Sequence, residues 1–133
     1  MSKNLQTVQA VYQAFATGDV PSILAQLSSD IDWEYSGAQE VPWLERRHGR
    51  DAVGGFFGAL AENLEFEKFA VNDVLAGDRV VVALVDLDAR VKRTGKRISE
   101  RDEVHVWRFD ESGKVVAFRH ALDSAAHVRA WAG

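Results

Sequence analysis

The sequence contains no cysteine, no long apolar run and no block of basic residues. Without cysteine, disulfides, thiolate nucleophiles and cysteine-ligated metal centres are excluded. No apolar segment approaches the roughly 20 residues that a membrane-spanning helix needs, and none follows Met1 as a signal segment would. The net charge is −4, with both signs spread along the chain. We therefore expect a cytoplasmic protein that binds neither membrane nor nucleic acid.

The 133 residues fit one domain with one core, and we expect a single domain over 1–133. The first half is dominated by helical periodicity, with Gly18 as a stop signal and Asp19 as an N-cap before Pro21. This half predicts helices over 5–15, 19–27 and 49–64, with a strand over 31–35.

The second half changes to strand patterns. Segments rich in Val, Phe and Ile are separated by Gly-containing turns at 77–78, 94–96 and 111–113. We expect strands near 65–75, 79–91, 97–109 and 114–122, then a short helix that ends near Trp131. Helices segregated to one face of an antiparallel sheet define an α+β domain.

Several short motifs resemble one family in their order and spacing. They are the turn at 16–20, the helix start at 49–53, and the last hairpin formed by 104–109, 113–116 and 118–123. Together they resemble the SnoaL-like / ketosteroid isomerase-like proteins of the nuclear transport factor 2-like superfamily, over nearly the whole chain. The resemblance implies a cone-shaped α+β fold, in which a curved antiparallel sheet wraps around three N-terminal helices and encloses a pocket.

Strand alternation and motif position together predict which side chains face that pocket. The predicted inward sets are Trp33 with Tyr35; Val82 and Leu84 with Asp86 and Asp88; His105 with Trp107 and Phe109; and Val116 and Phe118 with His120.

The resemblance also compares the chain with enzymes of the same fold. Ketosteroid isomerases have their general-base Asp where this chain has Tyr35, and their protonated Asp where it has His105. Their oxyanion Tyr falls at Val11, one step from Tyr12. The arrangement is not reproduced, which argues against steroid isomerisation by that mechanism.

Limonene epoxide hydrolases offer a second comparison, since Asp86 matches one of their two Asp and His120 lies at the other. Leu84 occupies the position of their Arg, so this set is also incomplete. Scytalone dehydratase combines His, Tyr and Asp around a water, and the residue types here resemble that mixture.

An imidazole suits proton transfer near neutral pH, and a tyrosine hydroxyl can donate to a developing oxyanion. We therefore take His105, Asp86, His120 and Tyr35 as candidate catalytic residues. An aromatic wall of Trp33, Trp43, Trp107 and Phe118 would bind the ligand. The predicted function is a cofactor-independent acid–base enzyme (isomerase, dehydratase, cyclase or epoxide hydrolase type) acting on a small apolar oxygenated ligand.

The alternatives remain open. His105 can be a hydrogen-bonded core histidine, Asp86 a strand-edge residue in water, and the aromatics ordinary core. The whole domain can be a non-catalytic binding protein, or an interaction module if its own aromatics fill the cavity. No metal is expected, since no HxH or HxxxH spacing occurs.

Two expectations concern the surface. The charged stretch 99–103 is expected to be exposed or to form cross-strand ion pairs at a subunit contact. A homodimer through the open sheet face is expected because a face this apolar would not stay in water. The apolar residues assigned to that outward face are Val81, Ala83, Val85, Leu87, Val104 and Val106.

Overall fold

A computed structural model describes residues 2–35 and 40–133, with the side chains of 34 and 35 outside the description. The helices are α1 (Lys3–Ala16), α2 (Val20–Leu24), the 3-10 turn η1 (Pro42–Leu44), α3 (Arg50–Asn63) and α4 (Ser124–Trp131). The strands are β1 (Leu27–Tyr35), β2 (Arg47–His48), β3 (Leu64–Ala76), β4 (Val80–Val91), β5 (Arg97–Phe109) and β6 (Val115–Ala121).

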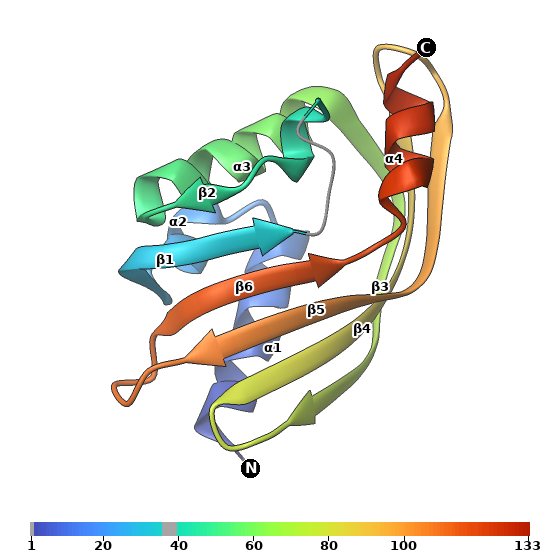
Figure 1. Ribbon diagram of the computed structural model, residues 1–133. Coiled ribbons are helices and arrows are strands. Elements are labelled where there is room, and N and C mark those ends of the chain that lie inside the picture. Colours follow the sequence, from blue (N-terminus) through green and yellow to red (C-terminus); the bar gives the residue numbers. More distant parts are fainter. Residues whose placement is uncertain (1, 36–39) are drawn as a thin grey trace.

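The six strands form one curved sheet in the order β2-β1-β6-β5-β4-β3 (Figure 1). All neighbouring pairs are antiparallel except β1 with β6, which run parallel. The α+β architecture predicted from the sequence is confirmed. Its second helix is shorter than predicted, because the chain already enters β1 at Leu27.

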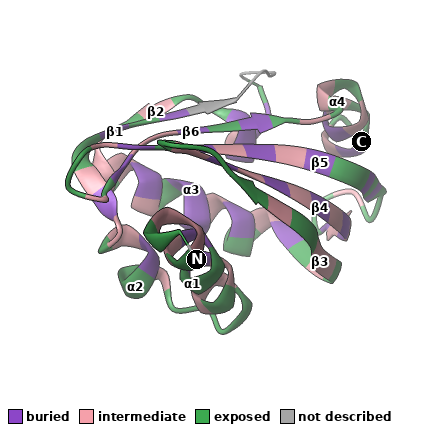
Figure 2. Ribbon diagram, turned by 90° about the horizontal axis from the view of Figure 1, so that it is seen from below, coloured by how far each residue is buried: buried purple, intermediate pink, exposed green. Residues whose placement is uncertain are grey.

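Helices α1, α2 and α3 lie on one face of the sheet, and the burial pattern follows this arrangement (Figure 2). The helix starts are capped as the sequence suggests: Asp19 Oδ1 accepts the Ser22 N–H at 3.2 Å, and Asp123 Oδ1 accepts the Ala126 N–H at 3.1 Å. None of the helices in the described ranges is long and apolar enough to cross a membrane.

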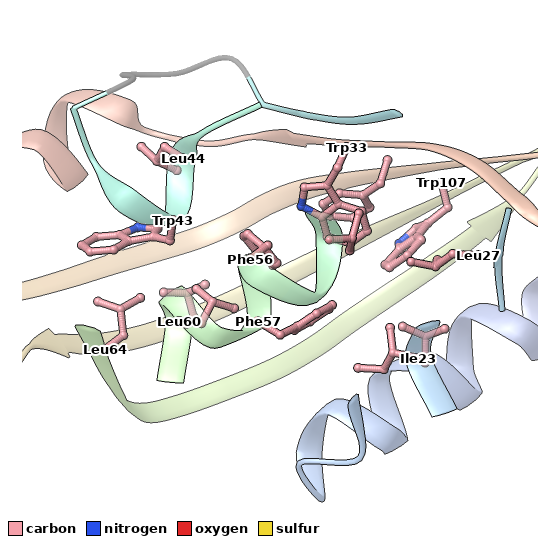
Figure 3. Close-up of a cluster of buried hydrophobic side chains, with 14 of the residues drawn as sticks. Ile23, Leu27, Trp33, Trp43, Leu44, Phe56, Phe57, Leu60, Leu64 and Trp107 are labelled. Carbon is pink, nitrogen blue, oxygen red and sulfur yellow. The ribbon is translucent and has the colours of Figure 1, made fainter. Parts of the chain in front are cut away.

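The core lies between the helices and the concave face. Figure 3 shows Phe56, Phe57 and Leu60 of α3 in a row of buried side chains, with Trp43 near one end and Trp107 near the other. Because this core is almost entirely aromatic and aliphatic, any polar group that lies within it requires an explanation.

The face assignment predicted for β4 is wrong. Val81, Ala83 and Val85 are fully buried on the concave side, so the alternate residues, Asp86 among them, face the convex side. The run from Val80 to Val85 is apolar on both faces and does not determine which face is inside. The two aspartates further along the strand do indicate it, because carboxylates favour water.

Candidate functional site

A small cavity of about 70 Å³ lies in the core between the helices and the concave face of the sheet. Six of the eight predicted site residues line it. They come from β1, η1, β5 and β6, and all six are buried. They are Trp33, Trp43, His105, Trp107, Phe118 and His120.

The two predicted histidines are direct neighbours. His105 of β5 is the register partner of His120 of β6, and their ring centres are 5.1 Å apart. Burial lowers the pKa of His120 well below its usual value, and the nearby His105 and His127 lower it further. His120 is therefore neutral at pH 7.

Asp86 does not belong to this cluster, which corrects the prediction made for it. Its carboxylate lies on the convex face, where it accepts the backbone N–H of Asp102 at 3.0 Å and lies 4.0 Å from Lys68 Nζ. These contacts, the backbone N–H first, lower the pKa of Asp86, so it remains ionised. The side chain of Tyr35 lies outside the described residues.

Two residues that the sequence analysis did not assign to the site, Tyr12 and Glu103, belong to this cluster. Tyr12 Oη lies 2.6 Å from His105 Nδ1, and Glu103 Oε1 lies 3.2 Å from His105 Nε2. The indole N–H of Trp107 donates to Tyr12 Oη at 3.1 Å. Burial raises the pKa of the Tyr12 hydroxyl, so it remains a protonated phenol.

With Glu103 as a carboxylate and His105 as a neutral ring, these contacts form one chain of hydrogen bonds. An indole N–H can only donate, so Tyr12 Oη accepts from Trp107 and its own proton is free to point at His105 Nδ1. Nδ1 then accepts, the ring proton lies on Nε2, and Nε2–H donates to Glu103. The chain of donors therefore ends at a carboxylate that is only 4% exposed.

A β-bulge in β5 directly precedes Glu103 and brings a second glutamate, Glu100, to the same face of the sheet. Glu100 pairs with Leu87 and Glu103 with Val85, so Arg101 and Asp102 together lie opposite the single residue Asp86. Asp102 adopts a positive φ of 56°. Glu103 faces inward by alternation with His105, and the extra residue turns Glu100 inward as well. The expectation that the stretch 99–103 is exposed is therefore wrong for these two glutamates.

His127 of α4 is a further cavity residue that the sequence did not single out. Its Nδ1 accepts the indole N–H of Trp43 at 2.9 Å, which leaves the ring proton on Nε2. Burial lowers the pKa of His127, so the ring is a neutral donor at pH 7. Trp43 thereby orients His127 in addition to lining the cavity.

Three of the residues around the cavity each carry a buried polar atom that has no hydrogen-bond partner within the described ranges. They are the donors Trp33 Nε1 and His127 Nε2 and the acceptor Glu103 Oε2. Buried polar groups are costly unless they bind a partner. A ligand with one hydrogen-bond donor and an oxygen acceptor would complement them.

Within the described part of the chain, one group of residues can also offer a metal three ligands. Glu103, His105 and His120 each present a ligand atom, and these atoms lie within 4.8 Å of one another. Two histidines and one carboxylate are a common donor set for divalent metals. Tyr12 would then support His105 from its other ring nitrogen.

The fold and this buried polar cluster define an α+β protein with a small internal cavity. The chain matches the SnoaL-like domain over residues 8–118 and belongs to that family. No curated protein matches it.

Solved structures extend the match to the whole chain. An NTF2-like protein of unknown function from Burkholderia pseudomallei K96243 is 29% identical, with both chains covered fully and a TM-score of 0.88. An NTF2-like protein from Burkholderia xenovorans LB400 is 26% identical, with 96% of this chain and 94% of that chain covered and a TM-score of 0.85. TerC, co-crystallized with polyporic acid, is 19% identical, with coverage of 99% and 100% and a TM-score of 0.84, which supports the fold alone.

Proposed function

We propose that the protein is a cofactor-independent acid–base enzyme that moves a proton on a small apolar oxygenated ligand, with Glu103 as the general base. The observation that carries the proposal is the hydrogen-bond chain from Trp107 through Tyr12 and His105, which ends at Glu103 Oε1. The second oxygen, Oε2, remains available to accept a proton.

The surroundings suit abstraction of a proton from a carbon next to a carbonyl. As Glu103 Oε2 takes the proton, negative charge develops on the carbonyl oxygen, and N–H donors in a water-poor site stabilise it. Trp33 Nε1–H and His127 Nε2–H are the donors near the cavity. His105 holds the carboxylate in position through Nε2–H, and its tautomer is fixed by Tyr12.

The test is proton exchange, which requires no knowledge of the natural substrate. Cyclic and aryl ketones are incubated with the protein in D₂O, and loss of the α-proton signals is followed by NMR. Glu103→Gln keeps the shape of the side chain and removes the base, so the exchange rate should fall at least 100-fold. The matched control is Glu62→Gln, an exposed position on α3. Exchange that survives in Glu103→Gln would refute the assignment.

The second candidate is a non-catalytic binding protein of the same fold. It is favoured by the lining of the cavity, which is mostly apolar and aromatic, as is typical of small-molecule binding sites. Ketones that shift the NMR spectrum of the protein without exchanging their α-protons would support this alternative.

A further inference from the structure

A second hollow of about 500 Å³ lies beside the inner cavity. It is bounded by the end of α1, the last turns of α3 and the start of β3, and it is open to the surface. Its only charged lining residues in the described part of the chain are Glu67 and Lys68, both exposed. The remaining lining is apolar or glycine, so this hollow offers contact area and few polar partners.

The wall between the two chambers consists of side chains. Six residues line both the inner cavity and the outer hollow: Phe15, Phe57, Leu60, Leu64, Phe66 and Phe69. The ring centres of Phe15 and Phe69 are 4.9 Å apart, and those of Phe15 and Phe66 are 5.7 Å apart. Because side chains close this wall, changes of rotamer can open it without a change of backbone.

The two chambers differ in chemistry. Glu103, His105 and His120 line the inner cavity and are absent from the lining of the outer hollow. The inner cavity, at about 70 Å³, is smaller than the several hundred Å³ typical of small-molecule sites. A larger ligand must therefore extend through the phenylalanine wall.

We propose that the outer hollow is the binding site for the apolar body of the ligand, whose small oxygenated head lies in the inner cavity. The ligand class is thus an amphipathic molecule with one compact polar end and an alkyl or aromatic tail. The position of the head rests on the proposed function, whereas the position of the tail rests on the shared wall alone.

The probes are phenol and its 4-ethyl, 4-butyl and 4-hexyl homologues, with binding measured by calorimetry. Each methylene that leaves water for an apolar chamber should tighten Kd about threefold to fourfold. In the wild-type protein, Kd should therefore fall steadily along the series. Affinity that does not change with tail length, or absence of binding by all four phenols, would overturn the proposal.

Two variants block the hollow without touching the inner cavity. Ala16 and Ala61 are exposed and line the outer hollow only. Ala16→Trp and Ala61→Trp should bind phenol as tightly as wild type does. They should lose most of the increase in affinity that a longer tail gives. Ala10→Trp, at an exposed position of α1 away from the hollow, is the matched control and should behave like wild type.

The outcomes separate this inference from the proposed function. If Glu103→Gln still exchanges α-protons, the catalytic role of Glu103 is refuted. The change of Kd with tail length tests the outer hollow independently of that result. If Kd falls with tail length in both tryptophan variants as it does in wild type, the tail does not lie in the outer hollow. If either variant instead converts an oligomer to a monomer in light scattering, the hollow is a contact with a second copy and the inference is wrong.

Discussion

The carboxylate of Asp86 on the convex face accepts the backbone N–H of Asp102 at 3.0 Å, and Asp102 is the residue directly before the buried Glu103. The side chain of Asp86 thereby holds in place the bulge that directly precedes Glu103. Asp86 is thus a positioning residue on the far side of the sheet from the cavity.

Asp86→Ala is expected to loosen the bulge and slow ketone α-proton exchange about tenfold, while the protein stays folded. Asp86→Asn retains a side-chain oxygen that can accept the same N–H, so it should recover most of the rate. The readout specific to positioning is the NMR chemical shift of the Glu103 carboxyl, which should move in the Ala variant and return in the Asn variant. Equal rates in all three proteins would contradict the role.

The sequence predicts the elements and six of the residues that line the cavity, mainly because these depend on local periodicity. His105, Trp107 and His120 are placed correctly on the concave face because alternation holds between them. Glu103 lies two residues before His105 on β5, so strand alternation alone predicts that both side chains lie on the same face. The charged stretch around it suggested exposure instead, and the bulge that brings Glu100 to the same face has no signal in a single sequence.

Tyr12 was missed for a different reason. On α1 it continues the apolar stripe, so its pattern is that of a core residue, and only the tertiary fold brings it to His105. A tyrosine hydroxyl buried among phenylalanines needs a partner, and this is the signal that could have indicated a polar group opposite.

Trp107 has both a packing role and a hydrogen-bonding role, which two variants separate. Trp107→Ala removes a side chain that is 2% exposed and should cost about 3–5 kcal/mol in urea unfolding. Trp107→Phe retains much of the bulk and removes the donor to Tyr12, so it should cost about 1–2 kcal/mol. If Ala and Phe cost the same, packing is not the larger contribution.

The homodimer remains a prediction. The structure changes which residues form the apolar face through which the two copies are expected to pack. On the convex face Leu84 pairs with Val104, and Val82 pairs with Val106 and with Leu75, which is 54% exposed. We expect light scattering to show a dimer at high micromolar concentration. Leu84→Lys should shift it to a monomer, and a monomeric wild-type protein would refute the prediction.

Zn²⁺ is expected to bind at Glu103, His105 and His120 and to inhibit proton exchange by withdrawing the base. The ligands bind a metal as neutral imidazoles and a carboxylate, so protons compete with Zn²⁺ and binding should weaken as the pH falls. His120→Ala should weaken Zn²⁺ binding at least tenfold in calorimetry. His48→Ala is the control, because His48 is exposed and pairs with Asp32 at 2.7 Å. Equal affinity in His120→Ala and wild type would show that the ion binds elsewhere.

Glu100 should make stability depend on pH. Burial raises the pKa of Glu100 to about 7 from its ordinary 4.5. The hydrogen bond from the Asp123 N–H opposes this rise, and the nearby charges of Glu103 and Asp123 add to it. Between these two pH values the folded state binds more protons than the unfolded state, so the contribution of Glu100 falls as the pH rises. His120 and His127 have lowered pKa values and contribute the opposite slope below about 6.5.

A difference between two proteins isolates Glu100 from these histidines. Glu100→Gln removes the charge and retains an oxygen that can accept the Asp123 N–H. Its Tm should be close to that of wild type at pH 5 and higher at pH 8, because only the wild-type protein then carries the buried charge. Glu62→Gln, at an exposed position, should show no such divergence. Parallel Tm curves for Glu100→Gln and wild type between pH 5 and 8 would mean that Glu100 titrates at its ordinary value.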